Sequence, residues 1–238
     1  MDKLKFVGDP KAQPVDGLDK VLGRAKYVGD MYLAGMLHAK ILTSPVPHAH
    51  ILRLDTSPAL EVPGVVAVIT SDDFIENGPL GYPIKDAFVL AHQKVRYVGD
   101  LIATVAAETL EAAEVGVKAI IFELEELPIV TDLAQALEDD ATLIPLEAPQ
   151  GKGNLCEALI VRNGNPDPIL EKCENTLNQS YHFQHQEHAY LETEGALAIP
   201  EPGGGVTVFA NDQSPHINRF NTASVLGLPP EQVRIVQP

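Results

Sequence analysis

Three histidines at three-residue intervals are the first candidates for chemistry in this sequence. His182, His185 and His188 lie in the stretch HFQHQEHAYLETEGALA, with Glu187 beside the last histidine and Glu192 shortly after it. A first-row metal ion needs three or four converging ligands of this kind. Spacing by three converges only on a helix, because successive positions of a strand alternate between its faces. The preceding text, TLNQSYHF, is typical of an extended chain, so we expect structural and surface histidines, and a histidine metal-binding protein is the less favoured alternative.

Other reactive side chains give weaker signals. His48 and His50 can share one face of a strand, but no third ligand lies near them in the sequence. Glu192 and Glu194 could act as a general acid and a general base. However, nothing in the sequence indicates the raised pKa or the cleft that acid–base catalysis needs. The two cysteines have no neighbouring histidine and form no Cys-x-x-Cys pair, so we expect reduced thiols. The residues alone therefore assign no catalytic group and no metal ligand.

The bulk composition narrows the class of protein. The 238 residues suffice for one large domain or two ordinary ones. A net charge of −16 would repel a phosphate backbone, which argues against nucleic-acid partners. The longest apolar runs, such as LIATVAA, are about seven residues, whereas a membrane-spanning helix needs about 20. The N-terminal text MDKLKFVGDPKAQ lacks the apolar region of a signal peptide, so we expect a cytoplasmic protein without a membrane span.

The first half of the chain alternates strand-like and helix-like patterns. The run VVAVIT at 65–70 is continuous and β-branched, which predicts a buried strand. Thr109 can cap a helix that ends near Ala119, and strand-like runs precede and follow it. Strand, helix and strand over 101–124 predict a βαβ-like unit in an α/β protein. The expected strands of this half are 36–42, 49–54, 65–70, 95–98, 101–106 and 120–124.

The second half of the chain is predicted to begin with a connector. Residues 128–165 are acidic and Gly-rich around a short helix near 133–137, and a second short helix is expected at 167–175. Ser214–Leu226 gives the clearest helical pattern, with Ser214 as N-cap, Pro215 at the first helical position and Gly227 at the end. Antiparallel strands are expected at 176–182, 195–199 and 206–210, and a last strand at 233–236.

Three separated blocks resemble a known family. The first runs from GRAKYVGD (23–30) through MLHAKILTSPVPHAHILRLDTSPALEVPGVVAVITSDDF (36–74). The second is VRYVGDLIATVAAETLEAAEVGVKAIIFELEELP (95–128), and the third joins QEHAYLETEGALA (186–198) to ANDQSPHINRFNTASVLGLPPEQVRIV (210–236). Their order resembles the molybdopterin-binding large subunit of the molybdenum hydroxylases, the xanthine dehydrogenase/aldehyde oxidase family, over about residues 16–238.

The resemblance implies a division into domains. Residues 1–16 would form an N-terminal arm, 17–130 the family's hammerhead-type α/β domain and 131–160 a connector. Residues 161–238 would be the first, incomplete part of a molybdopterin-binding domain, giving an α/β (α+β) fold overall. In this family the dithiolene sulfurs of the pterin hold the metal, so the resemblance gives the histidines of QEHAYLE no ligand role.

The resemblance carries one site residue over to this sequence. In the family, a glutamine between a strand and a helix after the QEHxxLE block lies by the molybdenum, and the matching residue is Gln213. The sequence also places Gln213 at a strand-to-helix turn, where backbone donors and the helix dipole favour an anionic ligand. Asp212 stands where the family usually has threonine. A carboxylate near an anionic cofactor must find a partner or point away, so we expect one of these for Asp212.

The resemblance also implies an activity and partners. The whole enzyme would hydroxylate an N-heteroaromatic ring or an aldehyde carbon with oxygen from water, using molybdenum–molybdopterin, of which this chain would supply only part of the site. Iron–sulfur and flavin groups would lie on partner subunits or domains. The family's Gly-rich GGGFGGK-like loop and its glutamate general base have no counterpart here, so no catalytic residue is assigned and the remainder of the large subunit is an expected partner. The alternative is a non-catalytic truncated binding or assembly module of the same fold.

Overall fold

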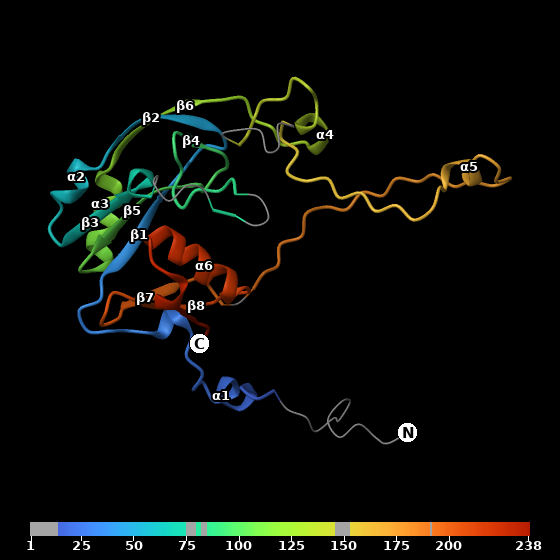
Figure 1. Ribbon diagram of the computed structural model, residues 1–238. Helices are drawn as coiled ribbons and strands as arrows, with labels where there is room; N and C mark the ends of the chain where they lie inside the picture. Colours follow the sequence, from blue (N-terminus) through green and yellow to red (C-terminus); the bar gives the residue numbers. More distant parts are fainter. Residues whose placement is uncertain (1–13, 75–79, 82–84, 146–152, 191) are drawn as a thin grey trace, which may run out of the picture. The chain divides into compact units, whose positions relative to one another are not determined.

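A computed structural model describes residues 14–74, 80–81, 85–145, 153–190 and 192–238 (Figure 1). The chain separates into two compact units. One comprises Gly35–Ala189, and the other joins the described residues up to Ala34 to Tyr190–Pro238. None of the described helices is long and apolar enough to cross a membrane.

The unit Gly35–Ala189 contains two antiparallel three-stranded sheets, with strand orders β1-β5-β3 and β4-β2-β6. The strands are β1 (His38–Thr43), β2 (Ala49–Asp55), β3 (Val65–Thr70), β4 (Lys94–Val95), β5 (Leu101–Ala107) and β6 (Ile121–Glu126). Strands β1 and β3 both pair with β5, and β2 pairs with β4 and β6. No two of the strands β1, β2 and β3 pair with each other. The expected strands of this half are therefore confirmed, although β4 is shorter than 95–98.

Short helices lie between these strands or follow β6, and one of them packs on a sheet. They are α2 (Ser57–Leu60), η2 (Ser71–Asp73), α3 (Leu110–Ala119), α4 (Leu133–Ala136) and α5 (Asp167–Leu170). The Thr109 side chain accepts a hydrogen bond from the Ala112 N–H at 3.1 Å, which confirms the predicted cap. A Cβ on Gly116 would lie 2.8 Å from Cγ1 of Val105 in β5, so glycine lets α3 approach the sheet closely.

The core of this unit lies between the sheets and helices. Strand β5 is central in its sheet, and Ile102, Ala103 and Val105 are fully buried. The buried set also includes Leu42, Ala49, Ala59, Ala91, Val95 and Ile120. The strand predicted at 65–70 is present as β3, but the prediction that it is buried is wrong. Strand β3 lies at the edge of its sheet, and Val66 is 53% exposed.

The predicted βαβ-like unit over 101–124 is also wrong. Strand β5 and strand β6 belong to different sheets, and every pairing of either strand is antiparallel. Helix α3 therefore connects two sheets and is not a crossover within one. Hydrophobic periodicity identifies a strand but does not say which sheet the strand joins.

The second unit contains one sheet, of order β7-β8-β9, and helix α6. Strands β7 (Ala196–Pro200) and β8 (Val206–Ala210) are antiparallel, whereas β8 and β9 (Val233–Val236) are parallel and are joined through α6 (Pro215–Leu226). Two short helices, α1 (Gly17–Val21) and η1 (Val28–Asp30), and the turn η5 (Pro230–Gln232) complete the unit. Its buried apolar cluster is small and consists of Val206, Ala223 and Val233.

The predicted strand at 176–182 is absent from the structure. Residues 153–190 are all described, and they contain no strand, while the helix expected at 167–175 is reduced to α5. Figure 1 shows this part as a long extended trace on either side of α5. The exposed segment, as we call residues 156–189, has no half-buried or buried residue. Parts of the predicted loop at 75–94 and of the connector, namely residues 75–79, 82–84 and 146–152, lie outside the described residues.

Candidate functional site

Gln213 lies in the turn Asn211–Ser214 between β8 and α6. Strand β8 is held on both sides by β7 and β9, so its carboxyl end is fixed by two ladders of hydrogen bonds. Helix α6 begins at Pro215, ends at Gly227 with φ of 64°, and packs Ala223 against Val206 and Val233. The helix start, the proline and the terminal glycine agree with the sequence, although the Ser214 side chain makes no cap hydrogen bond.

Asn211 anchors the turn to the end of the QEHAYLETEGALA block. Its Oδ1 accepts a hydrogen bond from the Gly195 N–H at 2.9 Å, and its Nδ2 donates to the Thr193 carbonyl at 3.3 Å. One side chain therefore satisfies both a donor and an acceptor of a neighbouring loop. The sequence reasoning missed this role, although an asparagine directly after a strand is a recognised turn signal.

Asp212 turns its carboxylate into its own loop. Its Oδ1 accepts hydrogen bonds from the Ser214 N–H at 2.7 Å and from Nδ2 of Asn218 at 2.8 Å. A carboxylate beside the N-terminus of α6 is also stabilised by the helix dipole. The expected partners are therefore found for Oδ1, within the turn and the first turn of α6, whereas Oδ2 is buried with no hydrogen-bond partner in the described part of the chain.

The Gln213 side chain is left exposed by these contacts. Its neighbours Asn211 and Asp212 use their side chains to hold the turn, whereas Gln213 presents a neutral amide beside a helix N-terminus. First-turn N–H groups such as those of His216 and Ile217 have no acceptor within the helix. An amide donor beside such groups suits an anionic or oxo-bearing ligand, so the turn fits part of a molybdenum–molybdopterin site.

The three histidines of the stretch HFQHQEHAYLETEGALA lie in the exposed segment. His182, His185 and His188 are all exposed, and the chain there is extended. Among the described residues, no group of three or more histidine, cysteine or acidic side chains is placed to hold a metal ion. The structure therefore gives these histidines no shared site.

His48 and His50 are also separated by their surroundings. His48 is 2% exposed, and its Nδ1 lies 2.8 Å from the Pro128 carbonyl, which makes Nδ1 the donor. His50 is exposed and pairs with Lys94 in the ladder between β2 and β4. His48 thus acts as a structural tie between the start of β2 and the connector.

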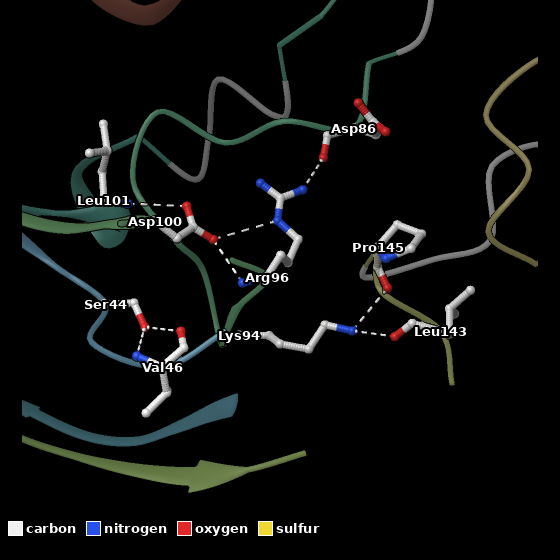
Figure 2. A network of polar contacts seen from close by, with 9 residues as sticks. All are labelled: Ser44, Val46, Asp86, Lys94, Arg96, Asp100, Leu101, Leu143 and Pro145. Atoms are coloured by element: carbon white, nitrogen blue, oxygen red, sulfur yellow. Dashed lines mark hydrogen bonds and ion pairs between the residues drawn. The ribbon is translucent and has the colours of Figure 1, made fainter. Parts of the chain in front are cut away.

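A polar network around β4 was missed by the sequence reasoning (Figure 2). Lys94 is 7% exposed, and its Nζ donates to the carbonyls of Leu143 at 2.9 Å and Pro145 at 3.0 Å. Arg96 donates through Nη1 to the Asp86 carbonyl and lies 3.7 Å through Nε from Oδ2 of Asp100. The network fastens the connector to β4, which is a structural role.

Burial changes the acid–base behaviour of this network. Desolvation lowers the pKa of Lys94, and the positive charge of Arg96 lowers it further. Desolvation also raises the pKa of Tyr97, with the charge of Asp100 acting in the same direction. Both shifts have structural causes, so they do not identify a catalytic group.

Two family models match the chain. Residues 22–128 match "Aldehyde oxidase and xanthine dehydrogenase, a/b hammerhead domain". Residues 148–238 match "Molybdopterin cofactor-binding domain". The turn that carries Gln213 and the whole exposed segment both fall within the second match.

Two relatives are similar to the chain along nearly all of its length. A probable xanthine dehydrogenase component of Bacillus subtilis (strain 168) is 36% identical over 231 residues, which cover 97% of this chain and 30% of that protein. The nicotinate dehydrogenase large molybdopterin subunit of Eubacterium barkeri is 34% identical over 223 residues, covering 94% of this chain and 51% of that protein. The chain thus spans about a third to a half of the length of these relatives.

A solved structure agrees with the fold. The aldehyde oxidoreductase from Desulfovibrio gigas matches with a TM-score of 0.81 and 28% identity. The match covers 94% of this chain and 26% of that chain. The residues of this chain outside the match are fewer than the residues of the exposed segment. The match to the solved structure therefore includes at least part of that segment.

Proposed function

The chain belongs to the xanthine dehydrogenase/aldehyde oxidase family of molybdenum hydroxylases, and from this premise we propose that it is the N-terminal portion of a molybdopterin-binding large subunit. The complete enzyme would oxidise an N-heteroaromatic or aldehyde substrate with oxygen from water. The chain alone would lack the complete active site. The placement of Gln213 carries the proposal, because it supplies an exposed amide donor at a braced strand-to-helix turn.

Gln213 would contribute to holding the cofactor. When bound, molybdenum–molybdopterin supplies the oxidation chemistry and the transfer of water-derived oxygen. The Gln213 amide would donate a hydrogen bond to an oxygen of the group, as a neutral donor that adds no charge. Asn211 and Oδ1 of Asp212 would keep the turn in place without contacting the cofactor, since their hydrogen bonds lie within this unit.

The topology of the sheet supports this position. Strands β8 and β9 are parallel, so their carboxyl ends lie at the same edge of the sheet. Gln213 follows β8, and the stretch Gln237–Pro238 follows β9 at that edge. Ligands of α/β folds commonly bind at the carboxyl ends of the strands. A further cofactor-binding loop after β9, as the resemblance implies, would therefore begin at the edge that carries Gln213.

Partners follow from the proposed activity. Electrons would leave through iron–sulfur and flavin groups on partner subunits or domains, in a cytoplasmic complex. The same chain spans 30% of one relative and 51% of another, so large subunits of this kind differ in length. The remainder of the large subunit would complete the cofactor pocket, on the same polypeptide or on a separate one.

One observation favours the alternative of a non-catalytic assembly module. The sheets over His38–Glu126 enclose a core of their own, which would let the chain fold and bind partners without a cofactor. This alternative predicts that the whole protein contains no molybdopterin. The proposed function predicts that it does.

The test uses the whole subunit expressed with its partners. We expect Gln213→Ala to lower kcat by about 10- to 100-fold, which corresponds to one hydrogen bond to a charged group. Turnover would be measured with a panel of N-heteroaromatic compounds and aldehydes, and molybdenum and pterin contents would be measured in parallel. Gln213→Glu should be at least as impaired, because it replaces a donor by an anion.

The matched control is Gln232→Ala. Gln232 is an exposed glutamine of the same unit, at the amino end of β9 and hence at the opposite edge of the sheet. It should leave turnover within about twofold of the wild type. Equal activities of the Gln213→Ala variant and the wild type would contradict the cofactor role, and a wild-type protein without molybdopterin would contradict the proposed function itself.

A further inference from the structure

The exposed segment has an unusual surface for part of a folded protein. Every residue from 156 to 189 is exposed, including large apolar side chains. Leu177 is 86% exposed and Phe183 is 87% exposed, values expected of an unfolded chain. Large apolar groups left in water cost free energy, and clusters of them mark interaction sites.

The backbone of this segment pairs with no strand among the described residues. Within the described residues, its hydrogen bonds are confined to α5 with its flanks and to two local contacts, Tyr181 with Gln179 and His188 with Glu187. An extended chain that pairs with no other strand has few contacts to offset the conformational entropy lost when it is ordered. Its N–H and C=O groups face solvent and so remain available to pair with a sheet edge.

The side chains of residues 177–185 alternate along the extended chain. Tyr181 donates through its hydroxyl to Oε1 of Gln179 at 3.4 Å, so these two side chains share a face, as residues two apart do in a strand. The face with odd numbers carries Leu177, Gln179, Tyr181 and Phe183, and the other carries Asn178, Ser180, His182 and Gln184. This is the pattern of a strand with one buried face, which explains why the sequence predicts a strand that has no partner in the structure.

The position of the segment in the family match identifies its partner. Residues 148–238 match one molybdopterin cofactor-binding domain, so the segment belongs to that domain and is not a linker between domains. The buried apolar cluster in the described part of this domain consists of only Val206, Ala223 and Val233. The relatives extend far beyond the matched region, and the net charge of −16 disfavours docking onto a second copy of the same chain.

We propose that residues 177–185 dock as a strand onto the remainder of the large subunit and bury the face of Leu177, Tyr181 and Phe183 there. This inference rests on the proposed function, because it takes the partner to be the rest of the cofactor-binding subunit. Main-chain hydrogen bonds to a sheet edge would supply affinity, and pockets for alternate side chains would supply register. The polar face with His182 and Gln184 would remain in solvent.

Hydrogen exchange of the whole subunit, followed by mass spectrometry, tests the proposal. The amides of 177–185 should exchange at least about tenfold more slowly in the whole subunit than in the 238-residue chain, because a docked strand opens only when its ladder breaks. The double variant Tyr181→Asp/Phe183→Asp should abolish this protection, because it places two charges on the docked face. The matched variant His182→Asp/Gln184→Asp adds the same two acidic groups to the other face and should keep the protection.

The possible outcomes separate this inference from the proposed function. A whole subunit that binds molybdopterin while residues 177–185 exchange as fast as in the 238-residue chain overturns the inference alone. A protected segment in a subunit without molybdopterin contradicts the proposed function but leaves the docking in place. Equal loss of protection in the two double variants, or protection of the 238-residue chain that rises with its concentration, also overturns the inference, the latter by identifying a second copy as the partner.

Discussion

The two units of the chain differ in how far each completes its own core. In the first, the sheets of His38–Glu126 enclose a cluster in which Ala49, Val95 and Ile102 are fully buried. In the second, one three-stranded sheet and α6 enclose a buried apolar cluster of only three residues, and the domain match that contains this cluster also contains the exposed segment. Because stability grows with the surface that a fold buries, the first unit is expected to fold by itself and the second to depend on further polypeptide. The candidate cofactor turn belongs to the dependent unit.

The largest expected effect breaks the first unit alone. Ile102→Ala removes a fully buried side chain from the centre of β5 and should lower the free energy of unfolding by about 2–5 kcal/mol. Urea denaturation of the 238-residue chain measures this loss, and hydrogen exchange locates it. The amides of β8 should keep their wild-type exchange if the units are independent.

Val66→Ala provides the control, because this β3 side chain is 53% exposed and its loss should cost within about 0.5 kcal/mol. Faster exchange in β8 of the Ile102→Ala variant would show that the two units unfold as one, so that the first unit does not fold independently.

A smaller effect is expected in the second unit. Asn211→Ala removes the acceptor of the Gly195 N–H and the donor to the Thr193 carbonyl, so local stability should fall by about 1–2 kcal/mol. The exchange rate of the Gly195 amide measures this change by NMR. Asn211→Asp keeps an acceptor for Gly195 but loses the donor, so it should retain most of the Gly195 protection. Identical exchange in both variants would show that Asn211 does not hold the turn through this bond.

The smallest effect concerns the pH dependence of the first unit. The pKa of Lys94 lies below its ordinary 10.5 because desolvation and Arg96 disfavour its charge. The folded chain therefore loses this proton before the unfolded chain does, and between the two pKa values the unfolded state binds more protons. The cost of burying the cation is full below the folded pKa and disappears as pH rises towards 10.5, so stability should increase with pH in that window.

Lys94→Met removes the titrating group, so the rise in unfolding free energy as the pH approaches 10.5 should become shallower than in the wild type. Lys94→Arg should show the same shallower rise in unfolding free energy with pH, because an arginine does not titrate in this range. Urea denaturation over this pH range measures both slopes, and unchanged slopes would show that Lys94 is not responsible.

The sequence predicted local structure better than tertiary structure. The cap at Thr109, and the helix that starts at Pro215 and ends at Gly227, depend on neighbouring residues, and the structure contains them. Strands β5 and β6 were also found, but the sheet that each joins depends on residues far away in the chain. Residues 176–182 have a strand pattern without a strand, because pairing requires a partner that the described residues do not include.

The candidate site divides in the same way. The turn that carries Gln213 was located from the adjacent strand, proline and helix pattern. The contacts of Asn211 were not foreseen, because their partners Thr193 and Gly195 lie 18 and 16 residues earlier. The Lys94 contacts with the connector span 49 and 51 residues, and no local pattern indicates them.

The pairing of the six strands in the first unit has a consequence for biosynthesis. Because the described structure pairs β1, β2 and β3 only with β4, β5 and β6, a nascent chain that has emerged up to Thr70 holds three strands and none of these partners. Contacts such as His38 with Ala107 close long loops, and non-local pairing of this kind slows folding. The ribosome must therefore deliver the chain as far as β6 before both sheets are complete, so a ribosomal pause before that point would hold the emerging strands open to aggregation.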